Sequence, residues 1–223
     1  MIGARLVPLG LGEAEALLRV SQWLSPAFPT SSYAYSHGLE AEIAKGHVAD
    51  ADGLERWISV VLRAGAGRSD AILVAAAMDE AADLDDLCDI ARALAGSAER
   101  WEETRDQGAA LARTLGEIGE GDGVNRPYPV AFGAAAKWLD LKVDVVLTLY
   151  LQAFAASLIS AAVRFMPLGQ SVGQGVHAAL RPVITDVARK ASRAGLDGLG
   201  QAAFGADLAA MEHEGLEVRI FRT

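Results

Sequence analysis

Apolar residues recur at helical spacing through most of this chain. The clearest run is Leu54, Trp57, Ile58, Val61 and Leu62, which fall at i, i+3, i+4, i+7 and i+8 and so share one helical face. The same pattern predicts helices near residues 13–24, 36–45, 69–82, 84–94, 97–115, 130–139, 144–164, 173–194 and 207–214. An alternating strand pattern never extends beyond a few residues. We therefore predict an all-α bundle of about ten helices.

Turn residues predict where these helices begin and end. Gly46 stands where a C-terminal glycine closes a helix. Asp52, with a glutamate three positions later, resembles a capping box and would begin the next helix, and Asp144 would cap a later one. Four glycines and two prolines make residues 116–129 the clearest loop. Pro182 is expected to kink the helix 173–194 or to split it in two.

The length of 223 residues fits a single domain over 1–223, with 1–12 and 215–223 as candidates for flexible ends. The N-terminal apolar run is short, broken by Pro8 and followed by acids, so no secretory signal is expected. Cys88 is the sole cysteine, which rules out an internal disulfide and agrees with a reducing, cytoplasmic location.

Charge and hydropathy restrict the class of partner. The net charge of −9 argues against nucleic acid, because neutralising phosphates needs a basic face. Hydrophobic residues make up 52% of the chain, which is high for a soluble monomer. The excess favours buried interfaces between chains.

Residues 145–163 carry no charge and are long enough to cross a bilayer. Thr148, Gln152, Ala156 and Ser160 nevertheless form a small and polar stripe at i+4 spacing. A lipid-facing helix has no need of such a stripe, whereas a central helix approached closely by its neighbours does. We expect a buried core helix and no membrane partner.

Residues 169–173 match the G-x-S-x-G nucleophile elbow, with Asp186 or Asp207 and His213 available to complete a triad around Ser171. The elbow needs a strand-to-helix turn, and the preceding residues have a helical pattern. A glycine-rich turn entering a helix is the favoured interpretation, and a serine hydrolase is the alternative. A phosphate-binding loop is excluded because no lysine lies between Lys142 and Lys190.

Glu99, Glu102, Glu103 and Asp106 share one helical face, but the Glu-x-x-His partner of a bundle metal site is missing. With Arg100 and Arg105 nearby, we interpret them as a solvated or partner-facing acidic stripe. The four histidines, His37, His47, His177 and His213, are not spaced as ligand pairs. We expect no metal site or cofactor within one chain, although symmetry-related histidines at a dimer axis stay open. His37 is expected to be structural, bonding a backbone carbonyl.

The least generic stretch is residues 22–40. It has two prolines three apart, and Phe28, Tyr33, Tyr35 and His37 lie within ten residues of an otherwise aromatic-poor chain. Such a stiff apolar loop is expected to be docked against something. Its segment 25–40, SPAFPTSSYAYSHGLE, resembles the N-terminal signature of the UreF family of urease accessory proteins. Ser31 stands where many relatives have glycine.

Further stretches resemble the family in the same order: 103–108, 128–133, 160–164 with 167–170, and the tail. The tail alternates apolar and charged residues, with Ile220 and Phe221 between arginines. Family tails read His-Glu-x-Gln-Tyr-x-Arg-Leu-Phe-Arg-Ser, and here Leu216 and Glu217 replace Gln and Tyr. Ordering on a partner and folding back onto the domain are both open for this tail.

The resemblance implies an all-α homodimer that is not an enzyme. Such a protein binds UreD (UreH in some organisms) and recruits the GTPase UreG, and the assembly loads nickel into apo-urease. The loop around Tyr33 would serve the GTPase or the dimer, and the tail would serve UreD. The candidate partner-binding residues are Phe28, Tyr33, Tyr35, His37, Glu40, His213, Glu214, Arg219, Phe221 and Arg222. A helical regulatory dimer unrelated to urease is the remaining alternative.

Overall fold

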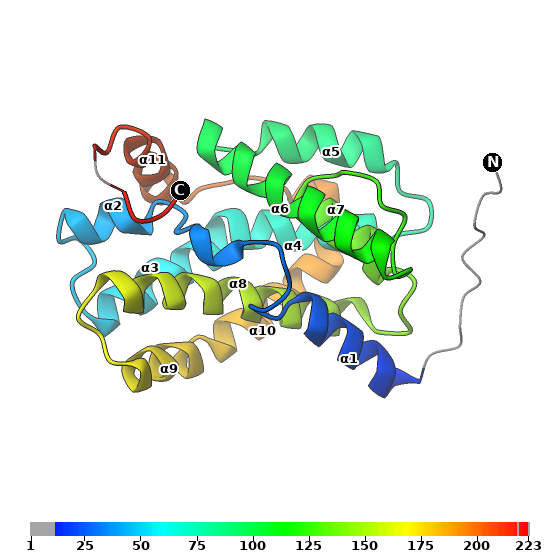
Figure 1. The fold of residues 1–223 in the computed structure, drawn as a ribbon, viewed down its shortest axis with the longest axis horizontal. Helices are drawn as coiled ribbons and strands as arrows, with labels where there is room; N and C mark the ends of the chain where they lie inside the picture. The colour runs from blue at the N-terminus through cyan, green and yellow to red at the C-terminus, as the bar shows by residue number, and fades with distance from the viewer. Residues whose placement is uncertain (1–11, 218, 223) are drawn as a thin grey trace.

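The computed structural model describes residues 12–217 and 219–222, so the prediction about an N-terminal signal lies outside the described residues. Within them the chain forms eleven α-helices, two short 3-10 helices and no strand, which confirms the all-α prediction (Figure 1). The elements are α1 (Glu13–Trp23), η1 (Ser32–Ala34), α2 (Leu39–Ala44), α3 (Ala51–Ala64), α4 (Ala66–Ala77), α5 (Leu84–Ala93), α6 (Ala98–Glu117), α7 (Tyr128–Ala136), α8 (Val143–Phe165), α9 (Gln170–Ala179), α10 (Arg181–Ala194), η2 (Leu196–Gly198) and α11 (Phe204–His213).

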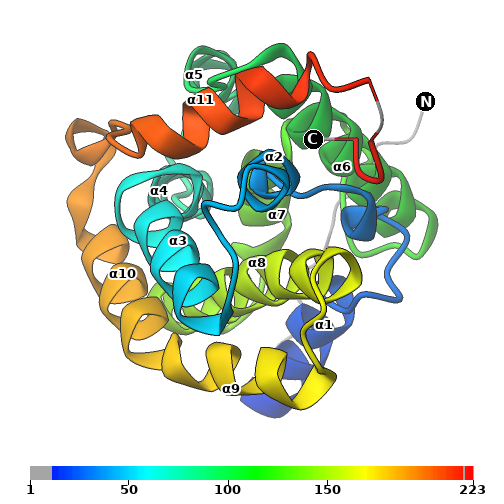
Figure 2. The same cartoon turned by 90° about the vertical axis from the view of Figure 1, so that its left-hand side faces the viewer.

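Helix α8 runs through the bundle and contacts α1, α2, α3, α4, α9 and α10 (Figure 2). By length and composition it is the one helix of the described chain that could cross a membrane, yet half of its most apolar window is buried inside the fold. Its apolar length is therefore explained by core packing. The small polar stripe differs from expectation, because Gln152 and Ser160 are exposed and border a cavity instead of a close helix neighbour.

An aromatic cluster fills the core beside α8. Phe132 of α7 lies edge-on to Trp23 with 6.3 Å between ring centroids, and 5.2 Å from Tyr150 of α8. Tyr128 stacks at 5.8 Å from Tyr150. The Trp23 indole also donates a 2.8 Å hydrogen bond to Glu120, so the last residue of α1 is fixed from two sides. This contact positions the start of the loop 24–31.

Helix α7 packs closely against α4 on one side and α6 on the other. The approach of α6 depends on Gly108, because a Cβ there would collide with the backbone of Arg126 and, at 2.7 Å, with the Tyr128 amide nitrogen. Gly108 ends the stretch 103–108 that resembles the family, and Tyr128 begins the next such stretch. The two motifs therefore meet in space at one backbone contact.

Several helix boundaries differ from the sequence predictions, for local reasons. Asp50, and not Asp52, caps α3, accepting the Gly53 amide at 2.7 Å. Asp144 lies inside the first turn of α8, where Lys142 is the N-cap. Pro182 does split the predicted helix, because α10 begins at Arg181 with the proline in its first turn.

Candidate partner-docking site

The loop before α2 is shaped by left-handed backbone at three positions. Ser31 and His37 have φ values of 58° and 57°, and Gly38 follows at 78°. A Cβ at Gly38 would lie 2.5 Å from the Ala210 amide nitrogen, so only glycine lets α2 begin against α11. The left-handed pair delays the helix start to Leu39, later than the sequence predicts. It also turns Glu40 into the interior.

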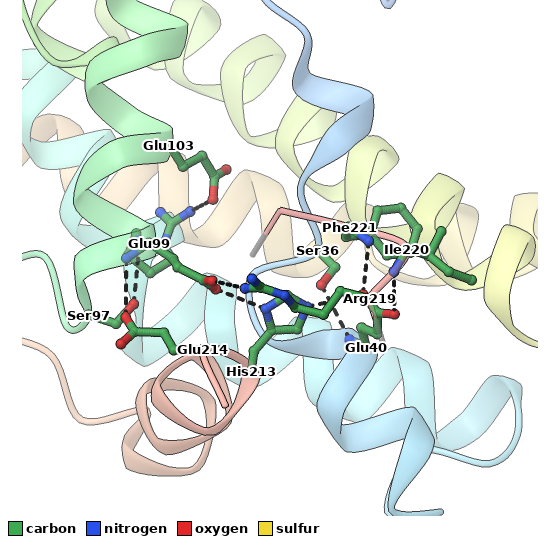
Figure 3. A network of polar contacts seen from close by, with 11 residues as sticks. Ser36, Glu40, Ser97, Glu99, Glu103, His213, Glu214, Arg219, Ile220 and Phe221 are labelled. Carbon is green, nitrogen blue, oxygen red and sulfur yellow. Dashed lines mark hydrogen bonds and ion pairs between the residues drawn. The ribbon is translucent and has the colours of Figure 1, made fainter. Parts of the chain in front are cut away.

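Glu40 is the anchor of the C-terminal tail (Figure 3). Its Oε1 accepts the Ile220 amide at 2.8 Å, and its Oε2 accepts the Phe221 amide at 3.0 Å. The Glu40 carboxylate is 2% exposed, and the Ser36 hydroxyl accepts its backbone amide at 3.3 Å. A buried carboxylate is costly unless it is bonded, and two main-chain N–H groups satisfy it here. Sequence separates these partners by almost the whole chain.

His213, fully buried at the end of α11, joins this anchor to α6. Its Nε2 lies 3.0 Å from Glu40 and its Nδ1 lies 2.8 Å from Glu99. Glu99 also pairs with Arg219 of the tail. One imidazole between two carboxylates therefore connects α2, α6, α11 and the tail in a single polar network (Figure 3).

The arginines of the tail and of α8 connect the tail to the loop. The Arg222 amide donates to the Ala34 carbonyl at 2.7 Å, and its guanidinium donates to the Tyr35 hydroxyl at 3.2 Å. Arg164 at the end of α8 lies over the Phe221 ring, 4.7 Å from its centroid, and also donates to the Tyr33 carbonyl. The loop and the tail thus form one surface, which we call the loop–tail surface and define by Tyr33, Arg164, Arg219, Ile220 and Arg222.

A second polar cluster lies beneath this surface. The Glu103 carboxylate pairs with Arg100, accepts the Gln107 amide at 3.1 Å and lies 2.9 Å from His37 Nε2. Burial together with the Arg100 charge lowers the pKa of His37, so its imidazole is neutral, and its Nε2 lies within reach of both the Glu103 carboxylate and the Arg100 guanidinium, 3.2 Å from the latter. Although burial opposes it, the charge of Arg100 holds the pKa of Glu103 down at about 2. His37 Nδ1 is buried without a hydrogen-bond partner.

This cluster corrects one sequence prediction and part of another. His37 bonds a carboxylate and not a backbone carbonyl. The acidic stripe of α6 is only partly solvated: Glu102 is exposed, whereas Glu103 is buried and Glu99 binds His213 and Arg219. Glu99 and Glu103 therefore face the chain's own loop and tail. No group of three or more His, Cys, Asp or Glu side chains in the described ranges could hold a metal ion.

The candidate residues divide into buried anchors and exposed groups. Phe28, Tyr35, His37, Glu40, His213 and Phe221 are buried. Tyr33 and Ile220 are 62% and 63% exposed, and Glu214, Arg219 and Arg222 are exposed as well. Of the two alternatives for the tail, the structure has it folded back on its own domain. Phe28 and Phe221 are buried within the single chain, and their part in partner binding stays a prediction.

The first turn of α6 is also held by the end of α11. The Glu214 carboxylate accepts the Glu99 amide at 3.2 Å, next to the helix cap in which the Ser97 hydroxyl accepts the Arg100 amide.

Of the two departures from the family tail, Leu216 is half-buried and Glu217 is exposed. Ser31, the other departure, occupies a left-handed position that favours glycine, which explains the residue found in many relatives.

Ser171 lies exposed in the first turn of α9, with Gly169 as the N-cap. The hydrolase alternative needs a strained strand-to-helix turn, and the described chain has no strand. The G-x-S-x-G match is therefore a glycine-rich helix start.

Sequence reasoning missed Glu99, Arg100 and Arg164 as parts of the site. The sequence pattern indicates only a charged helix face for the first two and a family-like motif for Arg164. Arg164 follows the uncharged run 145–163, and that isolation is a usable signal. Nothing in the local pattern of α6 indicates which acid faces the tail.

Exposed tyrosine, isoleucine and arginine side chains on an acidic all-helical body define a protein with a surface suited to binding other proteins, because aromatic residues and arginine are enriched in interfaces. Comparison with known proteins gives the family. The UreF family model matches residues 48–181. The chain is 64% identical to the urease accessory protein UreF of Jannaschia sp. (strain CCS1), over 95% of this chain and 96% of that protein.

Two further relatives carry the same name. The urease accessory protein UreF of Cereibacter sphaeroides (strain KD131 / KCTC 12085) is 56% identical over 93% of this chain and 99% of its own length. The urease accessory protein UreF of Paracoccus denitrificans (strain Pd 1222) is 44% identical over 93% of this chain and 96% of its own length. The chain belongs to the UreF family of urease accessory proteins.

Proposed function

We propose that this protein is a non-catalytic scaffold of urease maturation. It binds UreD (UreH) and recruits the GTPase UreG, so that nickel is inserted into apo-urease in the cytoplasm. Family membership supports a role as a urease accessory protein. The observation that carries the scaffold role is the loop–tail surface, where exposed Tyr33 and Ile220 lie among arginines on a chain of net charge −9.

The tail side of this surface is assigned to UreD. Arg219 and Arg222 are exposed and positively charged, and Ile220 is an exposed apolar side chain between them. Phe221 acts from beneath, because its buried ring and its amide hold Ile220 outward. Tyr33, linked to the tail through Arg164, is assigned to the interface with UreG or with a second copy. A partner bound to the tail therefore also reaches the loop.

The proposed homodimer has a separate supporting observation. Phe204, Leu208 and Met211 of α11 are exposed large apolar side chains at i, i+4 and i+7. This spacing places them on one helical face. An exposed apolar stripe of this kind is typical of an interface and costs solubility when it is left open.

The test is recovery of UreD and UreG from mixtures with purified variants. Ile220→Asp is expected to reduce UreD recovery at least tenfold, because it places a charge in an apolar contact while keeping the main-chain N–H that Glu40 accepts. The matched control is Val172→Asp. Val172 is also an exposed β-branched residue, but it lies on α9 and not in the tail, so this change should leave recovery unchanged. Equal UreD recovery by the full chain and by protein ending at Glu212 would remove the tail from that interface.

Deletion of the gene tests the function itself. Urease activation is expected to fail without the protein and to recover only in part with excess nickel. Normal activation in the deletion strain would refute the role in urease maturation.

A further inference from the structure

A cavity of about 450 Å³ lies between the loop, α6 and α8. That volume lies in the range of roughly 300–1,000 Å³ typical of small-ligand sites. The exposed Tyr33, Gln152 and Ser160 border it, so it opens to the surface. Trp23, Tyr128, Tyr150 and Phe154 contribute aromatic walls. Partner docking on the loop–tail surface does not require a cavity of this kind, so the residues that line the cavity need a separate explanation.

The polar side of this cavity carries one carboxylate without a cation of its own. The Arg100 guanidinium is paired with Glu103, and the neutral His37 adds no charge. Asp70 of α4 also lines the cavity, and its hydrogen-bond partner is the Tyr150 hydroxyl at 3.3 Å. Among the described residues Asp70 belongs to no ion pair. Above its pKa the cavity therefore has a net charge close to −1.

The surroundings of Asp70 determine when that charge is present. It is faced by Tyr150 from α8, by Arg100 and Glu103 from α6, and by Tyr128 from α7. Burial raises the pKa of Asp70 to about 6, and the Arg100 charge only partly opposes this effect. At pH 7.5 the carboxylate is ionised and lacks a counter-ion, which is costly in a partly desolvated site.

We propose that this cavity binds an organic monocation, an alkylammonium or a guanidinium group, with the Asp70 carboxylate as its counter-ion. Aromatic rings attract such cations through their faces, and a single carboxylate supplies the charge. A divalent metal needs several donor atoms, and no suitable group of ligands is present in the described part of the chain. The cation belongs either to a free amine or to a lysine or arginine side chain of another protein.

Calorimetric titration of the full-length protein tests this. At pH 7.5, n-butylammonium and methylguanidinium are expected to bind saturably with Kd on the order of 1 mM or tighter, and neutral butan-1-ol is not. Asp70→Asn keeps the side-chain shape and is expected to weaken the binding of both cations at least tenfold. Asp140→Asn, at an exposed site, is the matched control and should bind like the wild type.

The pH dependence gives a second, variant-free measurement. Because the pKa of Asp70 is about 6, about one carboxylate in ten is ionised at pH 5, so affinity should fall roughly tenfold from pH 7.5. Two side-chain mimics, N-acetyl-lysine methylamide and N-acetyl-arginine methylamide, distinguish the two possible origins of the cation. If they bind as tightly as the free cations, the natural ligand is a protein side chain. If they bind more weakly, it is a free amine. Absence of saturable binding by either free cation, equal binding by Asp70→Asn, or equal binding of butan-1-ol would overturn the proposal. None of these outcomes bears on partner recovery or urease activation.

Discussion

Replacing Glu40 with glutamine probes the contact on which the loop–tail surface depends. The wild-type carboxylate accepts the Ile220 and Phe221 amides on different oxygens, and the second oxygen also contacts His213. Glutamine retains one acceptor and presents an NH₂ group where the other oxygen was. At least one buried main-chain N–H loses its partner. A hydrogen bond to a charged group contributes about 1.5–3 kcal/mol, so docking of the tail should weaken by about 2–4 kcal/mol.

Amide hydrogen exchange measures this directly. In Glu40→Gln the exchange of the Phe221 amide should accelerate tenfold or more, and trypsin should cleave after Arg219 sooner than in the wild type. Glu42→Gln is the matched control on the same helix, because Glu42 pairs with Lys45 and His47 near the surface and not with the tail. Its effect should stay below about 0.5 kcal/mol. Unchanged exchange at Phe221 in Glu40→Gln would refute the anchoring role.

Four further predictions concern stability, each measured as the free energy of unfolding in urea. Ser31→Gly should stabilise the protein by about 0.5–1 kcal/mol. Glycine relieves the strain of the left-handed backbone, and this gain exceeds the cost of the extra conformational entropy that glycine has in the unfolded chain. Gly108→Ala should destabilise by about 3 kcal/mol or more, because its Cβ meets backbone atoms that have no room to move. The pKa of Glu103 is lowered to about 2 from 4.5, so its contribution of about 3 kcal/mol is complete above pH 4.5 and is lost as pH falls towards 2. The pKa of Asp70 is raised to about 6 from 3.8, so a cost of up to about 3 kcal/mol accumulates as pH rises from about 3.8 to 6 and is fully present above pH 6. Asp70→Asn should therefore be more stable at pH 8 by about 1–3 kcal/mol.

Each of these has a result that contradicts it. Ser31→Gly less stable than the wild type would show that the loop needs the serine hydroxyl. Gly108→Ala at wild-type stability would mean that α6 and the start of α7 separate without cost. A Glu103→Gln variant with the same acid transition as the wild type, or an Asp70→Asn variant less stable at pH 8, would show that the assigned charges do not control the pH dependence.

The acidic face of α6 shows the limit of local reasoning. Helical spacing correctly places Glu99, Glu103 and Asp106 on one side of a helix, and the capping residue Ser97 begins it. The spacing carries no information about what lies opposite. Here the opposite groups are His37, His213 and the tail arginines, which come from both ends of the chain. A pattern that looks solvated in sequence is therefore partly covered in the fold, with Glu103 buried and Glu99 bound to His213.

The sequence alone determined the helices, because the 3.6-residue period, the caps and the glycine and proline breaks act over a few neighbouring residues. Its motifs also identified the loop 22–40 and the tail as the unusual parts of this chain. The packing of the helices, by contrast, brings these two parts together, lets Glu40 hold the tail, and leaves Asp70 without a counter-ion beside an aromatic cavity. Those features arise from contacts between distant residues, such as Tyr35 and Arg222, which lie 187 positions apart. Such contacts depend on how the helices pack, and no local pattern along the chain encodes that.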